Sequence, residues 1–364
     1  MNDQNRTAWV DVAKGVSILL VVTMYSAYNT GEYTGGVGFL HYVIGFATPF
    51  RMPEFFLISG LFLSRVIDRP WRSYADRRIV HYFYFYLVWA FIMIALKVGV
   101  YGASPTEMAH DYALALVEPY GVLWFVYLLG VFGAVIKLCR QIRIPHWIVV
   151  STAAVLQMAH VVSPSYIVQQ FAAYFVFYYA GYVFSPLVFR VAAWAQENRS
   201  GAAQGLAAWA LANGLLVFSP GFEVLPTHTQ MGYAAFPPVH LALALAGAVA
   251  LCVFAALVCQ RPATNWLRWL GEHSLVVYLA FTIPMSLFRA FALWSGIITQ
   301  TGPLSAAVLV VSVVTPIALF WIVKRSSFGG FLFERPDWAR INAASRFAGS
   351  NLSGVDRSLG RVAR

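Results

Sequence analysis

The sequence contains very little charge. Asp, Glu, Lys and Arg make up 11% of its 364 residues, whereas hydrophobic residues make up 60%. A soluble domain averages about 25% charged and about 45–50% apolar residues, so the composition excludes an ordinary soluble protein. It predicts an all-α polytopic membrane protein in the lipid bilayer, because helices satisfy their own backbone hydrogen bonds in hydrocarbon.

Cysteine is scarce, and the sequence lacks a convincing cleavable leader. Cys139, Cys252 and Cys259 have neither a disulfide framework nor metal-ligand spacing, so we expect no metal site and no bound cofactor. Asp11 interrupts the first apolar run and no small-x-small cleavage site follows it, so we expect this run to remain as a helix. The net charge of +10 fits loops that face anionic lipid, and we expect no nucleic-acid partner.

Ten apolar segments approach the length of about 20 residues that a helix needs to cross the hydrocarbon. They are 10–29, 38–63, 82–101, 119–138, 146–163, 166–188, 202–219, 238–259, 266–294 and 303–323. The fifth and seventh are the weakest because they are short and rich in alanine. We therefore predict about ten transmembrane helices in a domain of residues 1–325, followed by a basic cytoplasmic tail, 326–364.

The loops carry an independent signal for the topology. Lys and Arg follow the even-numbered segments, including five arginines between segments two and three: Arg65, Arg69, Arg72, Arg77 and Arg78. The loops after the odd-numbered segments contain no Lys or Arg and carry acids instead: Glu32, Glu107, Asp111, Glu118 and Glu223. This alternation follows the positive-inside rule and predicts that both termini are cytoplasmic.

Three basic residues fall inside the segments. Lys97 and Arg289 lie near outer ends, where long side chains can snorkel toward water. Arg51 lies in the middle of 38–63, three residues before Glu54 and between Pro49 and Pro53. Charges at membrane depth are costly and usually face a protein interior or a wet site, and the two prolines predict a broken helix.

Two interpretations of Arg51 and Glu54 are open. They line an intramembrane site, or they form a structural ion pair between helices.

The first segment carries a polar stripe. At 100° per residue, Lys14 and Tyr25 share one helix face, and Asp11, Ser17 and Tyr28 lie within about 60° of Lys14. Lys14 and Tyr25 are separated by about three turns, or roughly 16 Å along the axis. The alternative interpretation is an anchoring lysine paired with Asp11 and a tyrosine belt at the interface.

Four stretches resemble the acyltransferase 3 family, the ten-helix membrane-bound O-acyltransferases of bacterial envelopes. WVDVAKGVSILLVV is similar to the family's first helix, and FRMPEFFLISGLFLSR to its second-helix signature. VLWFVYLLGVF, which contains Trp124, resembles the Leu-Trp-Phe motif of its fourth helix. LGEHSLVVYLAFTIP, with Ser274 and Tyr278, resembles its late Gly-x-x-Ser-Leu-x-x-Tyr stretch. Together they extend over about residues 9 to 325.

The resemblance implies an acyl transfer across the bacterial cytoplasmic (inner) membrane. An acyl group, often acetyl from acetyl-CoA, is taken at the cytoplasmic side and delivered to a hydroxyl of an extracytoplasmic envelope or secreted glycan. The family's first helix usually has an Arg, ten intervening residues and a catalytic His, whereas this chain has Lys14 and Tyr25 at these positions. A late His is also replaced, by Ala280 and Phe281.

A tyrosine with an ordinary pKa near 10 is a poor general base at neutral pH. Other residues that could act as the base are His273, Glu272, His41, His81 and Glu54. We nevertheless predict a catalytic group of Tyr25, Lys14, Arg51 and Glu54. The predicted residues for binding the substrate and donor are Asp11, Tyr28, Arg77, Arg78, Trp124, Ser274 and Tyr278.

The arginines of 65–78 have two interpretations. Guanidinium forks suit the phosphates of acyl-CoA, but basic inner loops are also the ordinary topology signal. Because the family's histidine is absent, two other functions stay open. One is a transporter or flippase-like carrier, and the other is a non-catalytic subunit of envelope polysaccharide assembly.

Overall fold

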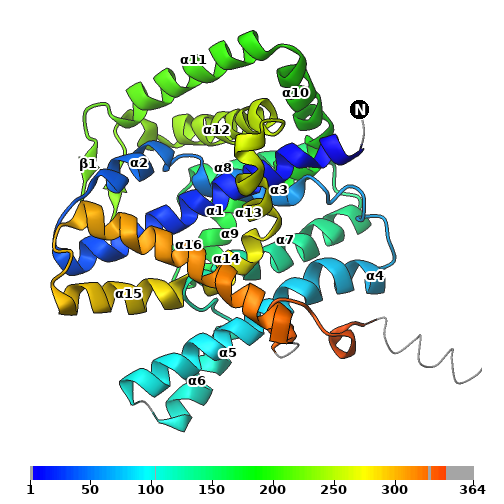
Figure 1. Cartoon of the computed structure of the whole chain (residues 1–364). Coiled ribbons are helices and arrows are strands. Elements are labelled where there is room, and N and C mark those ends of the chain that lie inside the picture. The colour runs from blue at the N-terminus through cyan, green and yellow to red at the C-terminus, as the bar shows by residue number, and fades with distance from the viewer. Residues whose placement is uncertain (1–2, 103, 327–328, 342–364) are drawn as a thin grey trace, which may run out of the picture. The chain divides into compact units, whose positions relative to one another are not determined.

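A computed structural model describes residues 3–102, 104–326 and 329–341, and it is almost entirely helical (Figure 1). Sixteen α-helices are present in this part of the chain. The only sheet in the described residues is one antiparallel pair, in which Glu223 lies opposite Gln230. The predicted all-α class is therefore confirmed.

The chain divides into two compact units. The first consists of Met1–Ser64 and Arg143–Ile322. Its elements are α1 (Asp3–Thr34), α2 (Phe39–Ala47), α3 (Arg51–Gly60), α8 (His146–Met158), α9 (Tyr166–Val183), α10 (Ser185–Glu197), α11 (Arg199–Val217), β1 (Glu223–Val224), β2 (Thr229–Gln230), η3 (Tyr233–Ala235), α12 (Pro237–Val258), η4 (Pro262–Thr264), α13 (Asn265–Glu272), α14 (Ser274–Ala280) and α15 (Thr282–Ser295).

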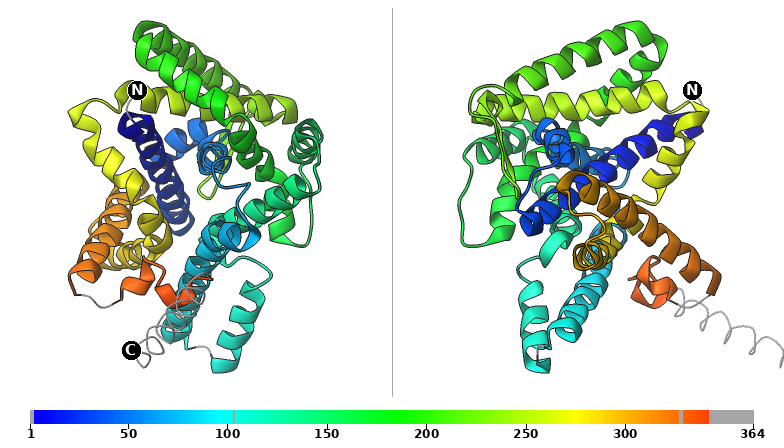
Figure 2. Two further views of the ribbon diagram at one scale, coloured as in Figure 1. Left: turned by 90° about the vertical axis from the view of Figure 1, so that its right-hand side faces the viewer. Right: turned by 60° about the vertical axis from the view of Figure 1, so that its left-hand side comes forward.

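The second unit consists of Arg65–Ile142 and Val323–Arg364. Its elements are α4 (Trp71–Ala75), η1 (Asp76–Val80), α5 (His81–Tyr101), α6 (Pro105–Ala115), η2 (Gly121–Leu123), α7 (Trp124–Gln141), η5 (Gly330–Leu332) and η6 (Asp337–Ala339). Helix α16 (Thr301–Ser326) begins in the first unit and ends in the second. Within the second unit, α5 and α6 pack side by side (Figure 2).

The polytopic character is confirmed, and the apolar helices differ in length. Among the described residues, five helices are long and apolar enough to cross a membrane, or seven if α9–α10 and α14–α15, bent by 72° and 52°, each count as one span. The other predicted segments are α8 with 13 residues, the alanine-rich α11, and 38–63, which is divided into α2 and α3. The predicted loop around Arg190 is instead the helix α10, which packs on α12.

Helix α3 lies at the centre of the first unit, where it packs on α1, α9 and α12. Its crossing with α9 is very close. A methyl group added at Gly60 would collide with the carbonyl oxygen of Tyr178, and one added at Gly181 would collide with that of Leu57. Small residues allow membrane helices to approach to this distance, so this crossing fixes the C-terminal end of α3 against α9.

The predicted break in 38–63 is present. Helix α2 ends at Ala47 and α3 begins at Arg51, with Pro49 between them. Pro53 lies in the first turn of α3, where its missing N–H is tolerated because that group has no intrahelical partner. The break therefore places Arg51 at a helix start in the middle of the apolar segment.

The predicted boundary at residue 325 stays a prediction. Part of the predicted tail folds within the second unit, where Tyr84 donates a 2.9 Å hydrogen bond to the carbonyl of Phe331 and Trp89 donates one of 2.9 Å to that of Leu332. The rest of that tail, 342–364, lies outside the described residues.

Candidate functional site

Arg51 and Glu54 do not pair with each other. Arg51 Nη1 donates to Thr48 Oγ1 at 2.8 Å, back toward the break that precedes α3. Glu54 is fully buried and contacts Ser17 of α1. No ion pair in the described part of the chain includes either residue. The structural pair proposed as one interpretation is therefore wrong, since α3 directs the two groups to different neighbours.

The contact between Ser17 and Glu54 has a simple hydrogen-bond stoichiometry. Ser17 Oγ lies 2.8 Å from the carbonyl oxygen of Ala13 and also contacts Glu54 Oε2. A hydroxyl has only one proton to donate. Both contacts are hydrogen bonds when Glu54 is a neutral carboxylic acid that donates to Ser17, which is the form that a fully buried acid without a cation favours.

A chain of hydroxyl groups connects Arg51 to α1. Thr48 Oγ1, which accepts from Arg51, lies 3.3 Å from Thr229 Oγ1 of β2. Thr229 in turn lies 2.8 Å from the hydroxyl of Tyr28 on α1. Tyr28 and Arg51, both predicted as site residues, therefore belong to one polar network.

Tyr25 approaches the same region through aromatic neighbours. Its ring lies 5.3 Å from that of Phe281, and Phe281 lies 6.1 Å from Tyr278. Tyr25 and Tyr278 thus share Phe281 as an aromatic neighbour.

Lys14 and Asp11 lie apart from this group, toward the other end of α1. Lys14 Nζ is 3.4 Å from Asp11 Oδ1, so the ion pair of the alternative interpretation is present. A second pair, Arg268 with Glu272 at 3.4 Å, belongs to α13, which packs on α1. Ser274 is buried where α14 begins, and in the described residues no contact joins it to Tyr25 or Arg51.

The predicted donor-binding residues of the second unit lie on helices. Arg77 is exposed and Arg78 is half-buried, both in η1, and Trp124 is buried at the first residue of α7. Asp76, beside the two arginines, is bound by Arg335 with an Nη2–Oδ2 distance of 2.9 Å. This acid is therefore neutralised by the C-terminal segment.

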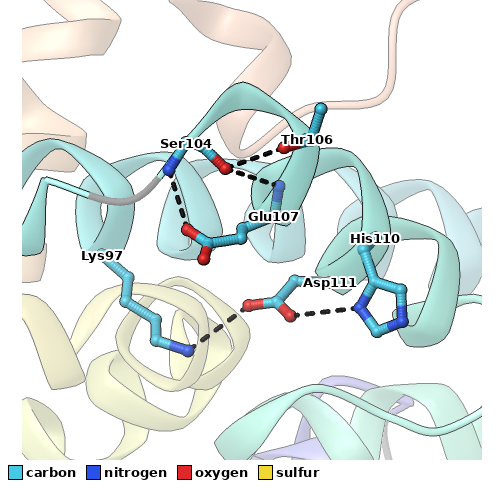
Figure 3. Close-up of polar contacts among 6 residues, drawn as sticks. All are labelled: Lys97, Ser104, Thr106, Glu107, His110 and Asp111. Atoms are coloured by element: carbon cyan, nitrogen blue, oxygen red, sulfur yellow. Dashed lines mark hydrogen bonds and ion pairs between the residues drawn. The ribbon is translucent and has the colours of Figure 1, made fainter.

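Lys97 is an exposed ion-pair residue. Its Nζ lies 3.3 Å from Asp111 Oδ2 (Figure 3). Asp111 belongs to α6, whose start is capped by Ser104 and Glu107 in a reciprocal capping box (Figure 3). The expectation that Lys97 reaches outward agrees with its 53% exposed side chain.

Comparison with known proteins identifies the family. A family model described as an acyltransferase domain matches residues 7–322. The chain belongs to the acyltransferase 3 family. It is also similar to the inner membrane protein YcfT of Escherichia coli K12, with 28% identity over 171 residues. That match covers 39% of this chain and 46% of the relative, so it spans less than half of YcfT. No solved structure matches the chain.

The histidines considered as bases in this acyltransferase 3 member have structural partners. In His41, Nδ1 accepts from the backbone N–H of Gly38 at 3.2 Å and Nε2 lies 3.0 Å from the carbonyl of Pro226. His273 Nδ1 lies 2.9 Å from the carbonyl of Trp269, and its ring stacks on that tryptophan. His81, in the second unit, packs edge-on against Tyr82 and Phe85.

Sequence reasoning missed His240 and Gln157. His240 lies in the first turn of α12, and its Nδ1 is 2.9 Å from Gln157 Nε2 of α8. The signal available in the sequence was a histidine opening an apolar helix directly after Pro237, Pro238 and Val239. In the described residues, no group of three or more His, Cys, Asp or Glu side chains could hold a metal ion.

Proposed function

We propose that this protein is an integral membrane acyltransferase of the bacterial inner membrane. It transfers an acyl group to a hydroxyl of an extracytoplasmic glycan, and the proposed donor is acetyl-CoA, which supplies an acetyl group. Family membership supports acyl transfer, and similarity to an inner membrane protein of E. coli supports the inner membrane. The observation that carries the proposal is the polar network that joins Tyr28 to Arg51 through Thr229 and Thr48 inside a bundle of apolar helices.

The reaction requires an oxygen nucleophile and a stabilised carbonyl. The acceptor oxygen attacks the thioester carbon, the C–S bond breaks, and CoA leaves as the thiol with the proton of the hydroxyl. Tyr25 donates its O–H to the carbonyl oxygen as negative charge develops there. A donor of this kind needs a positioned proton and no basicity, and one is worth about 3–4 kcal/mol.

We assign roles to the other predicted residues as part of this proposal. Arg51 supplies positive charge to the polar network that includes Tyr28, and Glu54 holds α3 against α1 through Ser17. Lys14 and Asp11 form a charged pair in the part of α1 that precedes the tyrosines. In the second unit, Arg77 and Arg78 bind the phosphates of acyl-CoA, and Trp124 offers an aromatic contact for the donor. Ser274 and Tyr278 of α14 support the acyl group.

The orientation is part of the proposal. Both termini are cytoplasmic, because the Lys and Arg of the loops fall on one side of the predicted topology. A reporter fused after Thr301 is expected outside and one fused after Arg143 inside. The opposite pattern of signals would contradict this orientation.

Acyl transfer is tested with purified protein in proteoliposomes. Acetyl-CoA and a bacterial glycan pool are added, and thiol release is measured together with the mass of the acylated glycan. The parent protein is expected to release CoA only when the acceptor is present. Failure of the parent and of Tyr25→His with acetyl-CoA and succinyl-CoA would favour the carrier or the assembly-subunit function.

A further inference from the structure

The β1–β2 hairpin, which lies beside α2, supplies Thr229 to the network of Tyr28 and Arg51 (Figure 1). Thr48 donates its one hydroxyl proton to the carbonyl of Ile44 at 2.8 Å. Its oxygen therefore only accepts, from Arg51 at 2.8 Å and from Thr229 at 3.3 Å. Because the proton of Thr229 is used on Thr48, the hydroxyl of Tyr28 donates to Thr229 at 2.8 Å. The network thus contains a position for one hydroxyl group, which accepts from Tyr28 and donates to Thr48.

The hairpin is anchored at its base. Phe222 directly precedes β1, and its ring lies 4.7 Å from that of Phe218 and 6.4 Å from that of Tyr42. On the other side of the hairpin, the backbone N–H of Gly232 donates to the carbonyl of Val217 at 3.0 Å. These contacts hold both ends of the hairpin against α11 and α2.

The tip of the hairpin is attached more weakly. None of residues 221–230, all of which the structure describes, is buried. Besides the two bonds of Thr229, the carbonyl of Pro226 lies 3.0 Å from His41 Nε2. A two-stranded pair is by itself only marginally stable in water, and Gly221 at the base has a φ of +95°, which glycine adopts readily. The tip can therefore leave α1 without exposing a core of its own.

We propose that the hairpin is a lid over this hydroxyl position, and that Thr229 fills the position when the lid is closed. When the lid opens, the acceptor hydroxyl takes the place of the Thr229 hydroxyl, accepting from Tyr28 and donating to Thr48. Tyr25 lies three residues before Tyr28, so the two tyrosines are neighbours on α1. The bound hydroxyl is then close to the proposed donor for the acyl carbonyl. The inference rests on the proposed function for the identity of the hydroxyl, which belongs to the glycan.

Gly31 offers a way to open the lid without changing a hydroxyl group. A methyl group added at Gly31 of α1 would collide with the carbonyl oxygen of Pro226 at the tip, so Gly31→Ala is expected to displace the tip. A methyl group at Gly205 of α11 meets nothing within 4 Å, which makes Gly205→Ala the matched control. Each variant is combined with Thr229→Cys, and mass spectrometry follows the labelling of position 229 by a polar maleimide.

The labelling experiment requires no acyl transfer. Loss of one hydrogen bond raises the open population about tenfold, so labelling of position 229 is expected to be about tenfold faster with Gly31→Ala. With Gly31 intact, adding the glycan pool of the transfer assay is expected to accelerate labelling, because the acceptor keeps the tip displaced. Gly205→Ala is expected to leave the labelling rate unchanged. Labelling that responds neither to Gly31→Ala nor to the glycan would overturn the lid.

Steady-state kinetics test whether the acceptor and Thr229 compete for one position. Thr229→Val keeps the shape of the side chain and removes its hydroxyl, so KM for the glycan is expected to fall about 2–10-fold. Thr229→Ser, which keeps a hydroxyl, is expected to stay closer to the parent. An unchanged or raised KM in Thr229→Val would overturn the competition.

The two experiments separate the lid from the proposed function. Accelerated labelling without any acyl transfer would leave the lid standing and overturn the acyltransferase function. Transfer with an unchanged labelling rate and an unchanged KM would do the reverse.

Discussion

Two arginines, one in each unit, differ in how their charge is balanced. In the second unit, Arg335 has a 7% exposed side chain and lies 2.9 Å from Asp76, and it also donates to the backbone carbonyl of Asp76 at 2.7 Å. In the first unit, Arg51 has a threonine hydroxyl as its one hydrogen-bond partner among the described residues. The chain therefore neutralises the arginine that holds a segment in place, whereas Arg51 has no acidic partner among the described residues.

Arg289 shows that an acid is not the only way to satisfy a buried arginine. It is 7% exposed, its guanidinium lies 3.9 Å from the centre of the Tyr33 ring, and it donates to the carbonyl of Asn29 at 3.5 Å. The expectation that Arg289 reaches outward is therefore wrong, because the ring of Tyr33 offers a cation–π contact inside the protein. In the part of the chain that the structure describes, Arg51 forms neither an ion pair nor a cation–π contact.

The largest expected effect comes from breaking the balanced pair. Asp76→Asn leaves the Arg335 charge buried without a counter-ion, and removal of one partner of such a pair costs about 3–5 kcal/mol. Chemical unfolding of the purified protein in detergent measures this loss. The double variant Asp76→Asn/Arg335→Met, which removes both charges, is expected to recover much of it. If Asp76→Asn were as stable as the parent, Arg335 would not depend on its counter-ion and would not differ from Arg51 in this respect.

The next effect concerns the hydroxyl of Tyr25. Tyr25→Phe keeps the ring contact with Phe281 and is expected to slow acyl transfer on the order of a hundredfold with unchanged folding. Tyr25→His recreates the usual residue of the family and is expected to retain or raise activity. Its rate should rise with pH through an imidazole pKa near 6.5. Initial rates from pH 5 to 9 check both variants, and parent-like rates for Tyr25→Phe would make Tyr25 a packing residue.

A smaller effect is expected when Arg51 keeps its charge and loses its fork. Arg51→Lys presents a single ammonium in place of two parallel donors. We expect kcat/KM to fall about tenfold, as for the loss of one hydrogen bond to a charged group, while the unfolding midpoint stays that of the parent. Steady-state kinetics and thermal unfolding on the same preparation check this. Full activity would show that charge alone is sufficient at this position.

The smallest effect is expected at Glu54. If Glu54 is a neutral acid bound to Ser17, Glu54→Gln keeps the shape and offers an amide N–H in place of the acid O–H. Stability and transfer rate should change by less than about 1 kcal/mol. Rate and unfolding measurements on this variant therefore test whether the charge of Glu54 contributes. A large loss of activity would mean that an ionised Glu54 takes part in the chemistry.

Much of the fold followed from local patterns. The all-α class came from composition, and the break between α2 and α3 came from Pro49. Helix phase placed Tyr28 on the polar side of α1, where it contacts Thr229. Helix α10 was missed because Arg190 and polar residues at its end were interpreted as a basic loop, although its apolar face packs on α12.

The site was less predictable because its partners come from distant parts of the chain. Residues three apart on a helix were expected to share a face, but Arg51 begins α3 and reaches back to Thr48. Gln157 and His240 are 83 positions apart, and Asp76 and Arg335 are 259 apart. No local pattern specifies such pairs, since they arise only when the helices pack.

The central claim is that the charge of Arg51 serves the substrate and the charge of Arg335 serves the fold. The most direct test measures acyl transfer per folded molecule for the parent and Arg51→Gln, with the folded fraction taken from unfolding curves of the same samples. Removing an unbalanced half-buried charge costs little stability, so Arg51→Gln should unfold with the parent and transfer at least about tenfold more slowly. Parent-like transfer per folded molecule, with a lowered unfolding midpoint, would contradict the account.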